Sequence, residues 1–375
     1  DEAGTAITTG RFNTLIGKEA GDALNDADSN VAIGKGALSS DTQGSQSTAI
    51  GTLALTAQNF TSATDAYNVA VGAEAGAAVT TGVRNTLIGG LSGDAITTGG
   101  DNVAVGANAL TSNTTASNNT AVGSASLITN TTGSFNTGLG NSALYANTTG
   151  TYNVAVGYQA LDANTTASNN TAVGYASLGA NTTGAQNTAV GQGAGASNTT
   201  GDSLAAFGRE ALEGNTTGDR NTAVGERALF VNTTADNNTG IGYFALGANT
   251  TGFENTAMGS ASLDANTTGS YNVAFGTNAL GVNTTASQNT AVGGFALDAN
   301  TTGSFNTAVG LNALGANTTA ENNTAVGKAA LEANTTGTSN TFIGSLCGDN
   351  AQTVSYSTLV GGNMSTGDTS SNNCN

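Results

Sequence analysis

The polar and apolar positions of this chain repeat every 17 residues. A pentad such as residues 119–123 (NTAVG) returns throughout, and 21 copies can be counted on its glycine, up to Gly361. Every step between these glycines is 17 residues except one of 21, between Gly51 and Gly72. A fixed short period indicates a repeat architecture, in which neighbouring units bury a shared core.

We number the repeat from the asparagine of the pentad, which gives the consensus N-T-A-V-G-x-x-A-L-x-A-N-T-T-G-x-x in columns 1 to 17. Column 5 is Gly in all 21 copies, and column 4 is always large and apolar. Column 1 is Asn in 18 copies and column 9 is Leu in 15. Disordered chains lack regularly spaced apolar residues of this kind, so we expect residues 11 to 361 to be ordered.

This pattern predicts short extended segments and no helices. One segment covers columns 1 to 4 and a second lies around columns 8 to 14. The glycine of column 5 predicts a corner, where φ is positive or another backbone comes close. Seventeen residues are too few for a βαβ crossover, and the chain contains no Asn-Gly or Asp-Gly hairpin signal.

We therefore predict an all-β fold, a parallel β-solenoid or β-roll with one coil per repeat. At roughly 4.8 Å per coil, 21 coils would form a rod about 100 Å long. The predicted organisation is an N-terminal lead-in or cap at 1–12, the solenoid at 13–361 and a C-terminal cap or tail at 362–375. The four extra residues near 59–65 predict a loop that bulges from one coil.

Three columns are expected to form structural ladders between coils. The asparagines of column 1 are expected to hydrogen-bond each other along the stack, as in cross-β assemblies. The glycines of column 5 mark the corner, and the leucines of column 9 fill the core. Representative members are Asn102, Asn119, Asn136, Asn153, Asn170, Gly106, Gly123, Gly140, Gly157, Gly174, Leu110, Leu127, Leu144, Leu161 and Leu178.

Two pairs of columns vary together. Where column 9 is Gly instead of Leu, column 12 turns apolar in four of five copies, as at Gly76 with Val79, which suggests one shared core volume. Where column 15 is Ala at Ala116, Ala235 and Ala320 instead of Gly, column 17 is Asn, at Asn118, Asn237 and Asn322. Because Gly and Asn accept left-handed backbone most readily, we expect a kink that moves between columns 15 and 17.

The pentad also predicts self-association. Side chains alternate along a strand, so Thr120 and Val122 face one side while Asn119, Ala121 and Gly123 face the other. One side carries Val or Ile, and the opposite side is also small and nearly uncharged, whereas a strand that faces water should alternate with polar or charged residues. We expect the coil's own core to cover one side and a second chain the other, in a homotrimer or another lateral assembly.

Composition and charge exclude several partners. The net charge is −17, with 8 basic against 25 acidic residues, which argues against nucleic acid and anionic lipid. No apolar run approaches the ~18 residues of a membrane span. The chain begins at Asp1 without an apolar leader, so we expect a processed chain or a fragment.

The cysteines do not form a disulfide framework. Only two are present, Cys347 and Cys374. Cys347 occupies the small column-8 position and predicts a buried thiol, whereas Cys374 lies in the tail. A bridge between them, or between chains, stays open at this stage.

The residue inventory gives little support to enzymatic chemistry. There is no His and no cysteine cluster, so we predict no metal site, no cofactor and no Ser-His or Cys-His nucleophile. Paired carboxylates for glycan cleavage remain an alternative. The charged residues Arg209, Glu210, Glu226 and Arg227 share columns in successive coils, which favours surface ion pairs.

The Asn-Thr-Thr triplets allow two further functions. Fourteen of them run from Asn113 to Asn334, and each is formally an N-glycosylation sequon. A rank of outward threonines could also order water, as in ice-binding solenoids. Those proteins present T-x-T on one flat strand, whereas adjacent threonines should place only one outward per coil, beside Asn.

The repeat resembles known surface-protein arrays. The pattern N-T-x-(V/I)-G-x-x-A-(L/G)-x-x-N-T-T-G is similar to arrays in phage tail-fibre and bacterial surface proteins that often precede an endosialidase-type chaperone domain. Pentads such as residues 30–34 (NVAIG) also resemble the head repeats of trimeric autotransporter adhesins, which are trimeric left-handed β-rolls.

This resemblance implies a non-enzymatic extracellular rod, either a fibre or filament subunit or an adhesin shaft on a cell or virion surface. Implied partners are further copies of the chain and surface glycans or a host receptor. The alternatives are an ice-binding β-solenoid and a glycan-cleaving tail spike.

Overall fold

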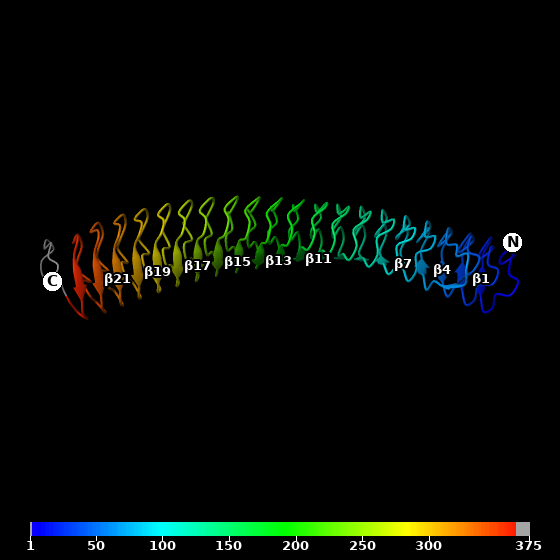
Figure 1. Cartoon of the computed structure of the whole chain (residues 1–375), viewed down its shortest axis with the longest axis horizontal. Coiled ribbons are helices and arrows are strands. Elements are labelled where there is room, and N and C mark those ends of the chain that lie inside the picture. Colours follow the sequence, from blue (N-terminus) through cyan, green and yellow to red (C-terminus); the bar gives the residue numbers. More distant parts are fainter. Residues whose placement is uncertain (1, 365–375) are drawn as a thin grey trace. The chain divides into compact units, whose positions relative to one another are not determined.

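The structure, a computed structural model, describes residues 2–364 and is an all-β parallel β-solenoid, with no helix in that range (Figure 1). The chain divides into two compact units, Asp1–Gln186 and Asn187–Asn375. Each unit is a stack of coils with one short strand per coil. The predicted fold class is therefore confirmed as a solenoid, with the 17-residue repeat as its coil.

The first unit contains one long parallel sheet and a two-stranded addition. The addition consists of β3 (Gly44–Ser45) and β5 (Thr64–Asp65), which pair in parallel. The strands of the long sheet are β1 (Thr14–Ile16), β2 (Val31–Ile33), β4 (Thr48–Ile50), β6 (Val69–Val71), β7 (Thr86–Ile88), β8 (Val103–Val105), β9 (Thr120–Val122), β10 (Thr137–Leu139), β11 (Val154–Val156) and β12 (Thr171–Val173).

The second unit contains a parallel sheet of the same kind. Its strands are β13 (Thr188–Val190), β14 (Ala205–Phe207), β15 (Thr222–Val224), β16 (Thr239–Ile241), β17 (Thr256–Met258), β18 (Val273–Phe275), β19 (Thr290–Val292), β20 (Thr307–Val309), β21 (Thr324–Val326), β22 (Thr341–Ile343) and β23 (Thr358–Val360).

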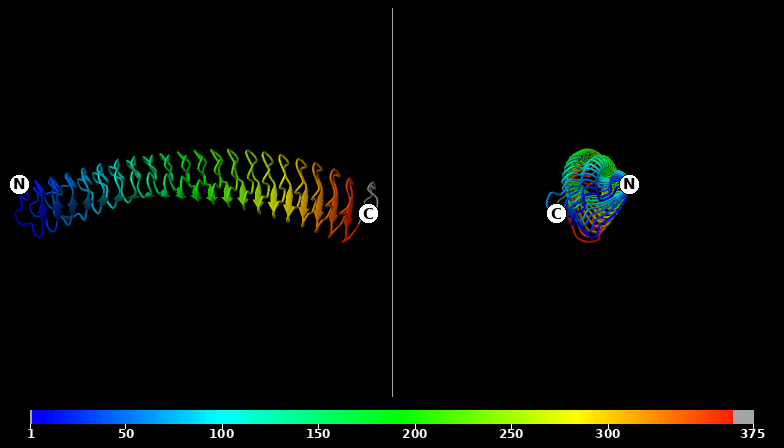
Figure 2. Two further views of the ribbon diagram at one scale, coloured as in Figure 1. Left: turned by 180° about the vertical axis from the view of Figure 1, so that it is seen from behind. Right: turned by 90° about the vertical axis from the view of Figure 1, so that its right-hand side faces the viewer.

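Each strand of the long sheets occupies columns 2 to 4 and pairs in register with the strand of the next coil, as Thr137 pairs with Val154. Within each unit the strands lie along one side of the stack and the turns along the other (Figure 2). Because equal columns face each other from coil to coil, every column becomes a ladder of like residues.

The interior of the coil is formed by columns 1, 3, 8, 9, 12 and 15. In the coil of β9, for example, Asn119, Ala121, Ser126, Leu127 and Asn130 are all fully buried. Columns 2 and 4 alternate with these and are half-buried or exposed in every strand. The predicted alternation along the pentad is confirmed, with the Asn and Ala side turned into the core.

The corner at column 5 has both properties that the sequence predicts. Gly123 has a φ of 132°, in the region that favours glycine. A Cβ atom built on Gly123 would lie 2.5 Å from the carbonyl oxygen of Gly140 in the next coil. Neither the backbone conformation nor the contact leaves room for a side chain.

The predicted second extended segment is wrong. Columns 6 to 11 form turns in place of a strand. The amide of Ser126 donates to the carbonyl of Gly123, and that of Asn130 donates to the carbonyl of Leu127. Left-handed backbone at columns 7 and 9, with φ values of 55° at Ala125 and 53° at Leu127, curls this side of the coil.

The trade between columns 9 and 12 has a backbone cause. Column 9 is left-handed whether it holds Leu161 (φ 51°) or Gly76 (φ 61°), so glycine fits there without strain. Both columns point into the core, because Leu161, Asn164 and Val79 are fully buried.

Column 3 takes part in the same exchange, which the sequence interpretation missed. A Cβ atom on Gly93 would lie 2.7 Å from Leu87 and 2.8 Å from Ile96. Leu87 stands in column 3, where most coils have Ala. A larger column-3 residue therefore also occupies the space that the missing leucine leaves.

The predicted movement of a kink between columns 15 and 17 is wrong. Column 17 is left-handed whatever its residue, as at Asn118 (φ 61°) and Phe135 (φ 61°), whereas Gly133 in column 15 has no positive φ. Column 15 is small for a different reason, because a Cβ atom on Gly218 would contact the carbonyl of Ala235 in the next coil.

The irregular segments behave in different ways. Residues 61–63 of the inserted loop are exposed, as the sequence predicts. The buried carboxylate of Asp41 holds the base of this loop by accepting hydrogen bonds from the amides of Gly44 and Phe60, both at 3.0 Å. Residues 2–12 pack against the first repeat, where the amide of Gly4 donates to the carbonyl of Ala20. Of the predicted C-terminal segment, only residues 362–364 lie within the described part.

Candidate functional site

Asparagines of column 1 form a buried ladder inside the coils. The side-chain oxygen of Asn119 accepts the backbone amide of Asn136 at 2.9 Å, and that of Asn102 accepts the amide of Asn119 at 3.0 Å. The side-chain nitrogen of Asn136 donates at 2.8 Å to the carbonyl of Gly150, which lies near the end of the same repeat. This ladder therefore joins neighbouring coils and also closes each coil.

A second buried ladder, which the sequence interpretation did not separate from the first, runs through column 12. The side-chain nitrogen of Asn147 donates to the oxygen of Asn130 at 2.7 Å and to the carbonyl of Gly150 at 3.1 Å. Buried amide groups are costly unless they are hydrogen-bonded, and here each satisfies the next. Both Asn columns thus have a structural role.

Burial of column 12 also bears on the sequons. Their asparagines, Asn113 to Asn334 in steps of 17, are fully buried. A glycan needs an exposed side-chain nitrogen, so the folded coil does not present these asparagines as acceptors.

The threonine that follows each sequon asparagine is also engaged. In column 13 the hydroxyl of Thr131 donates to the carbonyl of Thr148 in the next coil at 3.0 Å. Of the two threonine columns of the triplet, only column 14 is exposed, as at Thr132. One threonine per triplet thus faces outward, as the sequence predicts, but the neighbouring asparagine lies in the core.

The outer face of the strands, columns 2 and 4, is the most unusual surface of each unit. Column 4 carries only Val, Ile, Leu, Phe or Met, and column 2 only Thr, Val or Ala, so neither column holds a charge. Leu139 is 37% exposed in the first unit, and Met258 is 46% exposed in the second. Continuous apolar surface of this kind typically marks an interaction site.

Aromatic side chains gather beside this face in the first unit. The rings of Phe135 and Tyr152 stack with centroids 5.0 Å apart, and those of Tyr158 and Tyr175 with centroids 5.8 Å apart. These residues directly precede or follow the pentads that contain β10, β11 and β12. We call this group the aromatic patch; its exposed members are Phe135, Leu139, Tyr152, Val154, Tyr158 and Tyr175.

The charged cluster of the second unit consists of ion pairs, as the sequence predicts. Arg209 pairs with Glu226 and with Glu210, the latter at 2.7 Å, and Arg227 pairs with Glu210. Hydrogen bonding to Arg227 lowers the pKa of Glu210. The guanidinium of Arg227 also lies 5.2 Å from the centre of the Phe230 ring. Both carboxylates of this cluster are thus held in ion pairs at the surface.

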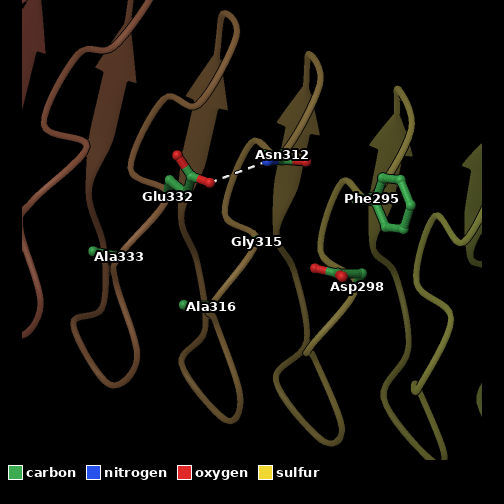
Figure 3. A pocket seen from close by; sticks show the side chains of 7 residues that line it. All are labelled: Phe295, Asp298, Asn312, Gly315, Ala316, Glu332 and Ala333. Carbon is green, nitrogen blue, oxygen red and sulfur yellow. Dashed lines mark hydrogen bonds between the residues drawn. The ribbon is translucent and has the colours of Figure 1, made fainter.

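A shallow groove runs along columns 7, 10 and 11 of the second unit (Figure 3). Its larger hollow, about 530 Å³, lies between the carboxylates of Asp298 and Glu332, and the side-chain nitrogen of Asn312 donates to Glu332 at 3.1 Å. Asp264 lines a smaller neighbouring hollow of about 270 Å³. Within residues 2–364 no group of His, Cys, Asp and Glu is arranged to hold a metal ion.

Burial raises the pKa of the Asp298 carboxyl, and the negative charge of Glu332 adds to this effect. Burial likewise raises the pKa of the carboxyls of Asp94, Asp162 and Asp264, all in column 10. A carboxyl whose pKa is higher in the folded state than in the unfolded state destabilises the fold when it is ionised. This cost is absent below the unfolded pKa, grows as pH rises from the unfolded pKa to the folded pKa, and is fully present above the folded pKa.

We therefore expect Asp298→Asn to raise the melting temperature at pH ~7 and to leave it almost unchanged below the ordinary carboxyl pKa of about 4. Thermal unfolding followed by circular dichroism across this range would measure the effect. Asp101→Asn is a control of opposite sign, because hydrogen bonding to Arg84 lowers the pKa of Asp101. A gain for Asp298→Asn that is equal at both ends of the pH range would contradict the prediction.

The thiol of Cys347 is buried, as its column-8 position predicts, and it is free. Burial raises its pKa. Cys374 lies outside the described residues.

Protein-family models and curated protein sequences yield no match to this chain. Among residues 2–364, no helix has the length and apolar character needed to cross a membrane.

Proposed function

We propose that this chain is a non-enzymatic structural subunit of an extracellular fibre or filament, and that copies associate through the outer face of strands β10 to β12 in the first unit. The observation that carries this proposal is the uncharged, apolar face of columns 2 and 4 on a chain of net charge −17. Two such acidic chains repel each other wherever their charged columns approach. The strand face is where they can meet without that cost, and burying it removes apolar surface from water.

The aromatic patch is the part of this face best suited to anchor a second copy. Aromatic residues dominate the binding energy of protein interfaces, especially when they surround a central apolar position. Leu139 and Val154 lie in the sheet, while the paired rings stand at the ends of its strands. The assembly we propose is a homotrimer, in line with the trimeric adhesin heads that the repeat resembles.

The buried ladders fit a mechanical role. Neighbouring coils are joined by backbone pairing and by both asparagine columns, so that force along the stack is shared among many hydrogen bonds. Solenoid stability is a sum of unit and neighbour contributions of this type.

Light scattering on the full chain tests the proposal. We expect a mass of three times 36.4 kDa for the unmodified protein and of 36.4 kDa for Leu139→Lys, which places a charge in the apolar face. Thr149→Lys changes an exposed column-14 residue of the same coil and should leave the assembly intact. A single-chain mass for the unmodified protein would refute self-association. If Leu139→Lys and Thr149→Lys both kept the mass of the unmodified protein, the chains would associate through another surface.

A further inference from the structure

We propose that the outer face of four strands in the second unit, β19 to β22, binds ice. We call this surface the ice face and define it by the column-2 and column-4 residues of these strands. They are Thr290, Val292, Thr307, Val309, Thr324, Val326, Thr341 and Ile343. This activity is separate from the proposed structural role and uses a different part of the chain from the aromatic patch.

The first argument is the availability of the hydroxyl groups. The hydroxyls of the column-13 threonines, such as Thr301 and Thr318, donate to backbone carbonyls of the next coil and cannot order a water layer. Within the described chain, the hydroxyls of Thr307 and Thr324 make no hydrogen bond to protein, although both side chains are half-buried. Each hydroxyl must therefore bond to water. The threonine rank that can hold ordered water is that of the pentad, not that of the Asn-Thr-Thr triplet.

The second argument is the geometry of the array. The four strands pair in register, Thr290 with Thr307, Thr307 with Thr324 and Thr324 with Thr341. Equivalent side chains therefore repeat about every 4.8 Å along the stack, and the two columns lie roughly 6.7 Å apart along each strand. These distances resemble the spacings of water oxygens on the prism faces of hexagonal ice. A rigid array at this spacing can hold water in positions that an ice crystal continues.

The third argument is the chemistry of the side chains. All eight residues of the ice face are β-branched, so their side chains are restricted in χ1 and keep methyl groups at fixed positions. Throughout the chain, column 2 is Thr in 15 pentads and Val in five, two residues of nearly the same shape. The array thus keeps the methyl position and varies only the hydroxyl. It also contains no charge, which would impose its own hydration shell.

The ice face differs in shape from the aromatic patch. Its column-4 residues are Val, Val, Val and Ile, whereas the patch has Leu139 in column 4 and exposed rings at the strand ends. Phe305 and Leu311 border the ice face before and after β20. The four-strand array consists only of β-branched side chains, which suits a crystalline surface, while the stacked ring pairs of the patch suit a protein partner.

The test measures thermal hysteresis and the shaping of single ice crystals. The full chain is used unmodified and as Leu139→Lys, which is intended to keep it monomeric, and each sample's mass is measured by light scattering. Activity in either form that is lost in Thr324→Lys and weakened in Thr324→Val, which keeps the methyl group but removes the hydroxyl, supports the proposal. Thr319→Lys, an exposed column-14 change in the preceding coil, should keep full activity.

Two results would overturn the proposal. One is the absence of ice shaping in both the unmodified chain and Leu139→Lys. The other is equal activity of Thr324→Lys and Thr319→Lys, with unchanged circular dichroism in both. The masses report on self-association independently, so a failure of the structural proposal is distinguished from a failure of ice binding.

Discussion

Gly123→Ala is expected to lower the free energy of unfolding by roughly 3 kcal/mol or more, the largest effect we predict for a single methyl group. Holding a residue with a side chain in a sparsely populated backbone region costs about 1–3 kcal/mol. Crowding an already packed site costs about 1–3 kcal/mol again. Both apply here, because Gly123 has a φ of 132° and its new Cβ atom would lie 2.5 Å from the carbonyl oxygen of Gly140.

The destabilisation should be confined mainly to the coils next to Gly123, because each coil of a solenoid contacts only its neighbours. Hydrogen exchange of the full chain would show it as lost amide protection around β9 and β10. Gly90→Ala is the matched control: Gly90 follows an equivalent corner glycine, has no positive φ, and a Cβ atom there has its nearest neighbour at 4.0 Å. Equal destabilisation by both changes would show that the corner conformation is not what requires glycine.

Leu161→Gly is expected to destabilise the chain by about 2–5 kcal/mol through the cavity it leaves, because Leu161 is fully buried. A gain in backbone energy should offset part of this destabilisation. Leu161 has a φ of 51°, and left-handed backbone costs a residue with a side chain roughly 1–2 kcal/mol that glycine avoids.

Asn164→Val tests the shared volume of columns 9 and 12. Alone, it should destabilise by about 1–3 kcal/mol, because Asn164 donates to the oxygen of Asn147 at 2.9 Å within a buried ladder. Combined with Leu161→Gly it should restore packing, as Val79 does beside Gly76. The recovery of stability should be partial, because the hydrogen bond from Asn164 to Asn147 is still missing.

A double-mutant cycle from denaturant unfolding of the full chain measures this coupling. We expect the double variant to be more stable than the sum of the single effects by more than about 0.5 kcal/mol. Strict additivity would mean that the two side chains do not share space. Thr149→Val, on an exposed column, provides a pairing with Leu161→Gly that should be additive.

The repeat, the coil and the strand follow from the amino-acid pattern alone. Its 17-residue period fixes one coil per repeat, and the alternation in residues 119–123 places a strand before a corner that only glycine can occupy. These features are local, because backbone geometry and side-chain alternation act over a few residues. The pairing of opposite charges at Arg209 and Glu226 was also predictable, since stacked columns turn a sequence distance of 17 into a contact.

The burial and backbone conformation of each column, by contrast, depend on the tertiary structure. An alternating pentad does not reveal that Asn119 lies in the core and Val122 outside, because a buried asparagine is stable only when partners from the adjacent coil satisfy it. Nor does it reveal that Leu127 is left-handed, a conformation that leucine avoids unless the packing of the coil enforces it. Both depend on contacts between coils. Because of these contacts, the apolar residues of column 4, such as Val122, lie on the outer surface of the protein and not in its core.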